Sequence, residues 1–244
     1  MAFELQFRTI EFGAGEGDLS PRALTGSGRR HVSRLVEGLG LSIASLVANW
    51  PGMRLTDPKS VDGRVERTRD IIDLAADLHV PIVATSLGAG THPETGEPSP
   101  LAVQALRALG EHADARRLRL AVIPTCDNGE RTASLLAEVA CPAVVVGIDP
   151  GAQVMAGHNP LAVIEWADGR IPIMYARDGG VGDSRRAGCE TRFGDGDVDM
   201  IGVLAALDEA DYHGPYIVRR IQSESPIEDL RIGYDRLEKM LSLV

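Results

Sequence analysis

Residues 146–160, "VGIDPGAQVMAGHNP", begin as an apolar run, reach an acid at Asp149 and continue into a loop that contains two glycines. Valine and isoleucine before an acid are typical of a buried strand, and Asp-Pro-Gly is typical of a turn. Asp149 therefore either serves a site at the end of a strand or caps the turn that follows. We favour the first interpretation.

The same succession of apolar strand, polar end and helix is repeated along the chain. We expect seven strands, each bounded by Gly, Pro or Asp, at residues 3–7, 42–50, 81–88, 119–125, 143–150, 171–178 and 216–221. Segments that fit helices lie at 26–39, 61–78, 98–116, 130–140, 160–168, 197–211 and 226–242. Repeated strand–helix units with apolar strands predict a parallel sheet covered on both faces, which leaves a barrel or a doubly wound sheet. We expect an α/β barrel of the TIM type.

Composition narrows the class of function. A chain of 244 residues suits one α/β barrel domain over residues 1–244. Acids outnumber bases by 35 to 25 and no basic run is present, so we expect a small-molecule ligand and no nucleic acid partner. Charged residues near the start and the lack of a run of roughly 18 apolar residues predict a cytoplasmic protein without membrane association. The three cysteines lack C-x-x-C spacing, which argues against a disulfide framework and a structural zinc site, and association into a homo-oligomer is left open.

Polar residues stand where several of the expected strands end. In parallel barrels these ends and the loops after them carry the chemistry. The ends in question are Asn49, Thr125 to Asp127, Asp149, Arg177 with Asp178, and Arg219 with Arg220.

Three stretches carry a resemblance to a known family. They are "GIDPGAQVMAGHNP" at 147–160, "GRIPIMYARD" at 169–178 and "FGDGDVDMIGVLAALDEADYHGPYIVRRI" at 193–221, and "LSPRALTGSGRRHVSRLVEGLGLSIASL" at 19–46 also fits. Together they resemble the xylose isomerase-like TIM barrels, a superfamily of sugar-phosphate isomerases and epimerases. The resemblance covers nearly the whole chain and implies that a first strand–helix unit is missing.

The resemblance implies a metal site in which only one of four ligands is kept. Family members hold a divalent ion with Glu, Asp, His and Glu, and Asp149 matches the Asp. Ile123 or Pro124, Tyr175 and Arg219 stand at the other three positions. An arginine repels a nearby divalent cation by several kcal/mol, so we expect no metal and no other cofactor, and we expect Arg219 to pair with Asp149 instead.

The resemblance and the strand ends select the candidate site residues. Asp149, Asp178 and Glu190 are the candidate catalytic acids or bases, and the candidate substrate-binding residues are Tyr175, Arg177, Arg192 and Arg219. The alternatives are ordinary ones: a turn cap at Asp149, a solvated ion pair at Arg177 and Asp178, and a charged surface loop at Glu190 and Arg192.

These residues suggest an isomerase- or epimerase-like protein that acts on or binds a small sugar-type ligand without the metal. One alternative is a non-catalytic barrel that binds an anionic sugar or serves as a partner subunit. Another is a metal-dependent isomerase with relocated ligands, for which His92, Asp127 and Glu190 lie in suitable loops.

Seven strands also raise the question of closure. A barrel of this type needs eight strands for regular tilt and stagger, so residues 3–7 and 216–221 would flank a gap. We expect direct but imperfect pairing of these two strands rather than cover by another chain.

Overall fold

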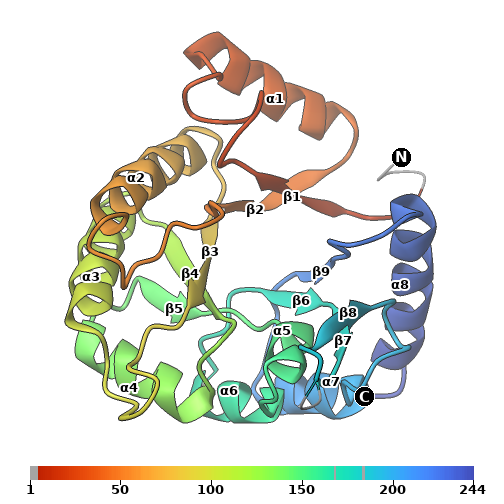
Figure 1. The fold of residues 1–244 in the computed structure, drawn as a ribbon. Helices are drawn as coiled ribbons and strands as arrows, with labels where there is room; N and C mark the ends of the chain where they lie inside the picture. Colours follow the sequence, from red (N-terminus) through yellow and green to blue (C-terminus); the bar gives the residue numbers. More distant parts are fainter. Residues whose placement is uncertain (1–4, 168, 183–184) are drawn as a thin grey trace. The chain divides into compact units, whose positions relative to one another are not determined.

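A computed structural model describes residues 5–167, 169–182 and 185–244, in which strands and helices alternate (Figure 1). Contacts divide the chain into two compact units. The first runs up to Val122 and includes Leu135–Val145, and the second comprises Ile123–Ser134 and Val146–Val244.

The first unit is built on a five-stranded sheet in the order β1-β2-β3-β4-β5. Its strands are β1 Thr9–Gly13, β2 Ser42–Val47, β3 Ile82–Gly88, β4 Arg119–Pro124 and β5 Val144–Val146, and the last residues of β4 and β5 belong to the second unit. Strands β1 and β2 are parallel, as are β2 and β3. The connecting helices are α1 Gly26–Gly38, α2 Val61–Asp77, α3 Pro100–Ala115 and α4 Gly129–Val139, and the part of α4 up to Ser134 belongs to the second unit.

The core of this unit lies between the sheet and its helices. In α2 the apolar residues Ile72 and Leu74 are fully buried, and α3 buries Leu106 and Leu109 beside them. Burial of side chains of this size contributes about 1.5–3 kcal/mol each, so the apolar face of each helix holds it against the strands.

The second unit carries the remaining elements. They are α5 Pro150–Met155, α6 Pro160–Ala167, β6 Met174–Ala176, β7 Asp178–Gly180, β8 Cys189–Thr191, α7 Met200–Glu209, β9 Tyr216–Val218 and α8 Pro226–Leu241. Strand β6 pairs in parallel with β9, and Met174 also forms a parallel bridge with Ile148, just beyond β5. Strand β6 therefore lies between the end of β5 and β9, while β7 and β8 form an antiparallel hairpin beside α5 (Figure 1).

Seven strands separated by helices, β1 to β6 and β9, occupy the described residues, as the sequence predicts. The position of the first strand was wrong. Residues 5–7 form a turn and an irregular segment, and the strand begins at Thr9, where it pairs with Ser42 of β2. Residues 1–4 lie outside the described residues, so the predicted pairing of 3–7 with the last strand loses its basis. The hairpin of β7 and β8 is not among the strands that the sequence predicts, and it places Glu190 in a strand rather than in a surface loop.

Gly129 offers a test of the packing in the second unit. A Cβ atom at Gly129 would lie 2.5 Å from the backbone oxygen of Ala162 in α6, a contact that backbone atoms relieve poorly. We expect Gly129→Ala to lower the free energy of unfolding by about 1–3 kcal/mol through overpacking. Gly38→Ala, at a helical glycine with no atom within 4 Å, is the control and should be neutral or slightly stabilising in urea unfolding. Equal effects of the two substitutions would contradict the described packing.

Candidate functional site

A buried arginine joins three elements of the second unit. Asp149 lies three residues after β5 and caps α5, where its Oδ1 accepts a hydrogen bond from the N–H of Ala152 at 2.9 Å. Arg177 directly follows β6, and Glu190 lies in β8. The Nη1 atom of Arg177 donates to Oδ2 of Asp149 at 3.0 Å, and its Nε atom donates to Oε1 of Glu190 at 2.7 Å. We call these three residues the Arg177 clamp.

The Arg177 clamp is nearly closed to solvent. The side chains of Arg177, Asp149 and Glu190 expose 12%, 4% and 2% of their surface. Burial lowers the pKa of Arg177, but the charge of Asp149 and the hydrogen bonds to both carboxylates raise it, and the net shift is upward. Burial raises the pKa of Glu190, whereas hydrogen bonds from the N–H of Gln222, Arg177 and the N–H of Ile221 lower it below its ordinary value. Arg177 and Glu190 are therefore both ionised at neutral pH.

Glu190 also ties the clamp to the segment after β9. Its carboxylate accepts hydrogen bonds from the N–H groups of Ile221, at 3.0 Å to Oε2, and Gln222, at 2.7 Å, and it lies 3.3 Å from Nη1 of Arg220. The loop between β9 and α8 is thus held by one side chain of the hairpin.

A second carboxylate continues this network on α8. Asp229 accepts hydrogen bonds from Nε of Arg192 at 2.7 Å and from the hydroxyl of Ser223 at 2.7 Å, and it pairs with Arg220 at 3.3 Å. The hydrogen bonds from Ser223 and Arg192 lower the pKa of Asp229. Arg192, a candidate substrate-binding residue, keeps 41% of its side chain exposed, so it is the part of the network most accessible to a ligand.

The carboxylate of Asp178 binds backbone N–H groups. Its carboxylate accepts hydrogen bonds from the N–H groups of Gly179, Gly194 and Gly196 at 2.8–3.0 Å and from that of Val198 at 3.3 Å. A Cβ atom at Gly196 would lie 2.2 Å from Oδ1 of Asp178, so glycine is required there. Asp178 lies beside the Arg177 clamp in sequence, yet its side chain fixes the loop that leads into α7.

Tyr175 and Arg219 lie together on β6 and just after β9. The Tyr175 side chain is fully buried, and the guanidinium carbon of Arg219 lies 5.0 Å from the centre of its ring, a cation–π contact. The prediction that Arg219 pairs with Asp149 was wrong, because the guanidinium that reaches Asp149 is that of Arg177. The reason is the strand order: β6 separates the end of β5 from β9, so Arg177 is the nearer cation.

The sequence interpretation missed three members of the site. Arg220 was noted only as a strand-end charge, and Ser223 and Asp229 were not considered. Asp229 lies in the first turn of α8, where acidic residues are common, so its sequence position does not indicate a site. Only the fold places it beside Arg192 and Arg220.

The residues proposed as relocated metal ligands do not form a cluster of ligands. His92 accepts hydrogen bonds at Nδ1 from the N–H groups of Glu94 and Thr95, which makes it part of a turn. In the described part of the chain, no group of three or more His, Cys, Asp or Glu side chains is placed to hold a metal ion.

Arg177 should contribute more to stability than an exposed arginine of the same unit. Arg177→Ala removes the cation that pairs with buried Asp149 and one of the two that pair with Glu190, the other being Arg220, and we expect it to lower the free energy of unfolding by about 3–5 kcal/mol. Arg170→Ala, at an exposed position, is the control and should change it by less than about 0.5 kcal/mol in urea unfolding. Similar losses for both variants would show that the clamp does not hold the unit together.

The lowered pKa of Glu190 predicts a loss of stability in acid. A carboxyl group with a lower pKa in the folded state stabilises the fold above its unfolded pKa of about 4.3, and this stabilisation is lost as pH falls through the folded value. We expect Glu190→Gln to flatten the dependence of the urea midpoint on pH below about pH 4.5. Glu165→Gln, at an exposed position, should leave that dependence unchanged, and an equal flattening by both would refute the assignment.

Comparison with solved structures shows the same fold in other proteins. A crystal structure of a xylose isomerase domain protein from Planctomyces limnophilus is similar with a TM-score of 0.86 and 19% identity, covering 98% of this chain and 89% of that chain. A xylose isomerase-like TIM barrel protein from Mycobacterium smegmatis in complex with magnesium gives a TM-score of 0.74 and 18% identity, over 99% and 86% of the two chains. The structure of an L-ribulose 3-epimerase gives the same TM-score, 0.74, with 18% identity over 99% and 86%.

These likenesses confirm the α/β fold of the TIM-barrel type. A search of curated proteins found no match. None of the described helices is long and apolar enough to cross a membrane. The family model for xylose isomerase-like TIM barrels matches residues 1–240, and the chain therefore belongs to this family.

Proposed function

We propose that this chain is an isomerase- or epimerase-like protein that acts on or binds a small sugar-type ligand without a divalent metal. Family membership and similar structures named as sugar epimerases support the ligand class. The observation that carries the rest of the proposal is that Arg177, a cation of the protein itself, pairs with Asp149.

The residues at the family's metal position do not fit a divalent cation. Asp149 uses one oxygen for the N–H of Ala152 and the other for Arg177. Tyr175 offers a buried phenol and Arg219 a guanidinium that lies against it, and neither is a ligand that magnesium or manganese prefers. Pro124 supplies no side-chain donor, and its carbonyl oxygen already accepts a hydrogen bond from Gln153 at 2.7 Å.

The arrangement offers charge stabilisation in place of a metal. Isomerisation or epimerisation next to a carbonyl removes a proton from carbon and places negative charge on oxygen. Arg219 and Arg177 are the cations available to stabilise that oxygen, and Asp149 and Glu190 are the available bases. The lowered pKa of Glu190 makes it a weak base and an unsuitable acid at neutral pH.

A second candidate function is a non-catalytic barrel that binds an anionic sugar. The observation in its favour is that each candidate acid or base is already satisfied by arginine or backbone groups. Proton transfer by Asp149 or Glu190 requires release of contacts to Arg177, whereas the exposed side chain of Arg192 binds an anion without rearrangement of the clamp.

Hydrogen exchange at the sugar carbon separates these possibilities. Protein treated with EDTA is incubated with L-ribulose or D-tagatose in D₂O, and loss of the C–H signal next to the carbonyl is followed by NMR. We expect exchange without added metal, and Arg219→Gln should slow it by about 10²–10³-fold because the developing oxyanion loses a cation. Arg170→Gln is the control and should leave the rate unchanged.

The other outcomes are equally clear. Exchange that appears only after manganese is added, together with an equivalent of metal in elemental analysis of protein purified without chelator, would refute the metal-free proposal. Sugar binding by calorimetry without any exchange would favour the non-catalytic barrel, and absence of both binding and exchange would refute the sugar-type ligand.

A further inference from the structure

Residues 219–225 connect β9 to α8, and we call this segment the strap. Its sequence, RRIQSES, contains one apolar side chain, that of Ile221, which is 56% exposed. No residue of the strap is buried. Segments with few buried apolar contacts open at a low cost in free energy, and polar contacts are what hold the strap in place.

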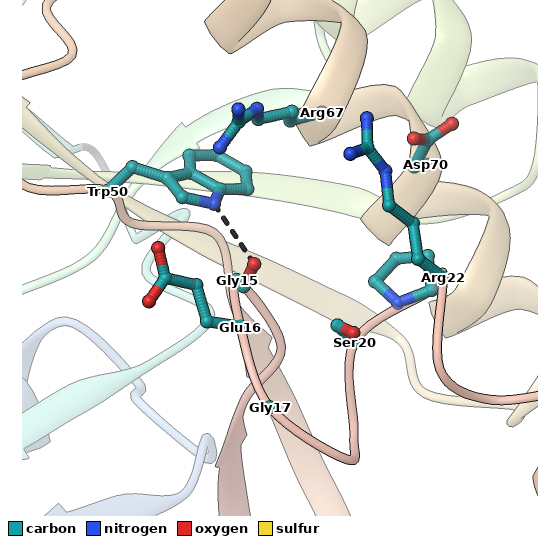
Figure 2. Close-up of a pocket in the computed structure, with 9 residues that line it drawn as sticks. Gly15, Glu16, Gly17, Ser20, Arg22, Trp50, Arg67 and Asp70 are labelled. Atoms are coloured by element: carbon teal, nitrogen blue, oxygen red, sulfur yellow. Dashed lines mark hydrogen bonds between the residues drawn. The ribbon is translucent and has the colours of Figure 1, made fainter.

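The loop between β1 and α1, in the first unit, is held in a different way. Its anchor is Trp50, which is 7% exposed and donates a hydrogen bond from its indole N–H to the carbonyl oxygen of Gly15 at 3.1 Å (Figure 2). Displacement of that loop exposes a large apolar ring to water, which is costly. The strap contains no comparable anchor, so its displacement exchanges polar contacts for contacts with water.

Arg220 is the centre of the polar contacts that hold the strap. Its Nη1 atom lies 3.3 Å from Oε2 of Glu190 on β8, and its Nε atom lies 3.3 Å from Oδ2 of Asp229 on α8. Nη1 also donates a hydrogen bond to the carbonyl oxygen of Thr191 at 2.7 Å. Glu190 in addition accepts the N–H groups of residues 221 and 222. One guanidinium therefore joins the two carboxylates that hold the strap.

The strap begins at Arg219, beside a fully buried tyrosine. The guanidinium carbon of Arg219 lies 5.0 Å from the centre of the Tyr175 ring, and the backbone N–H of Arg219 donates to the carbonyl oxygen of Ala176 at a rather long 3.3 Å. Displacement of the strap carries the guanidinium away from the ring. Water and solutes then reach the face of Tyr175 that Arg219 covers.

We propose that the strap is a gate over Tyr175, and that Arg220 with its two carboxylates is the latch. The elements at both ends of the strap stay in place when it opens, because β9 is paired with β6 and α8 is anchored by buried Leu237. The strap therefore moves as a local segment between two fixed ends, which is the usual construction of a hinged loop.

This inference goes beyond the proposed function, because the opening of the strap is defined and measured without a sugar. Under the proposed function it adds a control of access. Arg219, the cation assigned to the developing oxyanion, is in position only when the strap is closed.

Hydrogen exchange followed by NMR tests the latch. The amides of Ile221 and Gln222 should exchange much faster than that of Tyr175, which donates to the carbonyl oxygen of Ile148, and their rates should not change with urea below the unfolding transition. Asp229→Asn touches neither strap amide but removes a charge that holds Arg220, so it should accelerate their exchange about tenfold.

Two further variants complete this measurement. Arg220→Gln, in which Asp229 keeps its contacts with Arg192 and Ser223, should accelerate exchange of the strap amides to a similar extent. Glu228→Gln, at the exposed position next to Asp229, is the matched control and should leave the rates unchanged.

Nitration by tetranitromethane, located by mass spectrometry, tests the gate itself. We expect Tyr175 to become reactive in Asp229→Asn and in Arg220→Gln, whereas Tyr212, which is buried and lies outside the strap, stays unreactive in both. The proposal is overturned if the strap amides exchange only by global unfolding, if Glu228→Gln accelerates exchange as much as Asp229→Asn, or if exchange accelerates while Tyr175 stays unreactive. Turnover of a sugar enters none of these measurements, so failure of the proposed function leaves the gate standing, and the reverse also holds.

Discussion

The buried guanidinium of Arg177 joins three elements of the second unit. A cation in a low-dielectric environment is tolerated only with opposite charges and good hydrogen bonds, and Asp149 and Glu190 supply both at 3.0 and 2.7 Å. Since the three residues come from the end of β5, the end of β6 and the hairpin, their pairing fixes where the hairpin lies. Glu190 also accepts hydrogen bonds from the N–H groups of Ile221 and Gln222, in the segment after β9. The position of this segment therefore depends indirectly on the charge of Arg177, which holds Glu190.

Arg177 and Asp178 are neighbours in sequence but organise two different parts of the unit. Arg177 is satisfied by carboxylates, and Asp178 is satisfied by backbone N–H groups of residues 194–198. This division has a chemical consequence. Asp178 carries four hydrogen bonds from groups that cannot move without unfolding the loop, so its role is to hold that loop. Asp149 and Glu190 each accept backbone hydrogen bonds as well, but each also contacts the Arg177 side chain, and a side-chain contact can be exchanged for a ligand without unfolding a loop.

The strand–helix order was predictable from the sequence because it depends on local patterns, namely apolar runs that end at Gly, Pro or Asp. The first strand shows the limit of this approach. Residues 3–7 and 9–13 both alternate apolar and polar side chains, and the choice between them is made by pairing of Thr9 with Ser42, a contact between residues far apart in sequence. The partner of Asp149 could not be predicted for a similar reason. Several arginines stand at strand ends, and the order of β5, β6 and β9 in space determines that Arg177 is the one in reach.

Under the proposed function, replacement of a metal by an arginine changes what the site can do. A divalent ion needs several ligands at once, so loss of any one of them lowers the affinity of the remaining ligands for the ion. A guanidinium needs only the carboxylate that it faces, and Asp149 therefore keeps a partner although Pro124, Tyr175 and Arg219 stand at the other positions. A metal binds a carbonyl and its neighbouring hydroxyl directly, whereas an arginine donates hydrogen bonds in a fixed plane. Stabilisation of an oxyanion is retained in this arrangement, but positioning of the two sugar oxygens must come from the surrounding side chains.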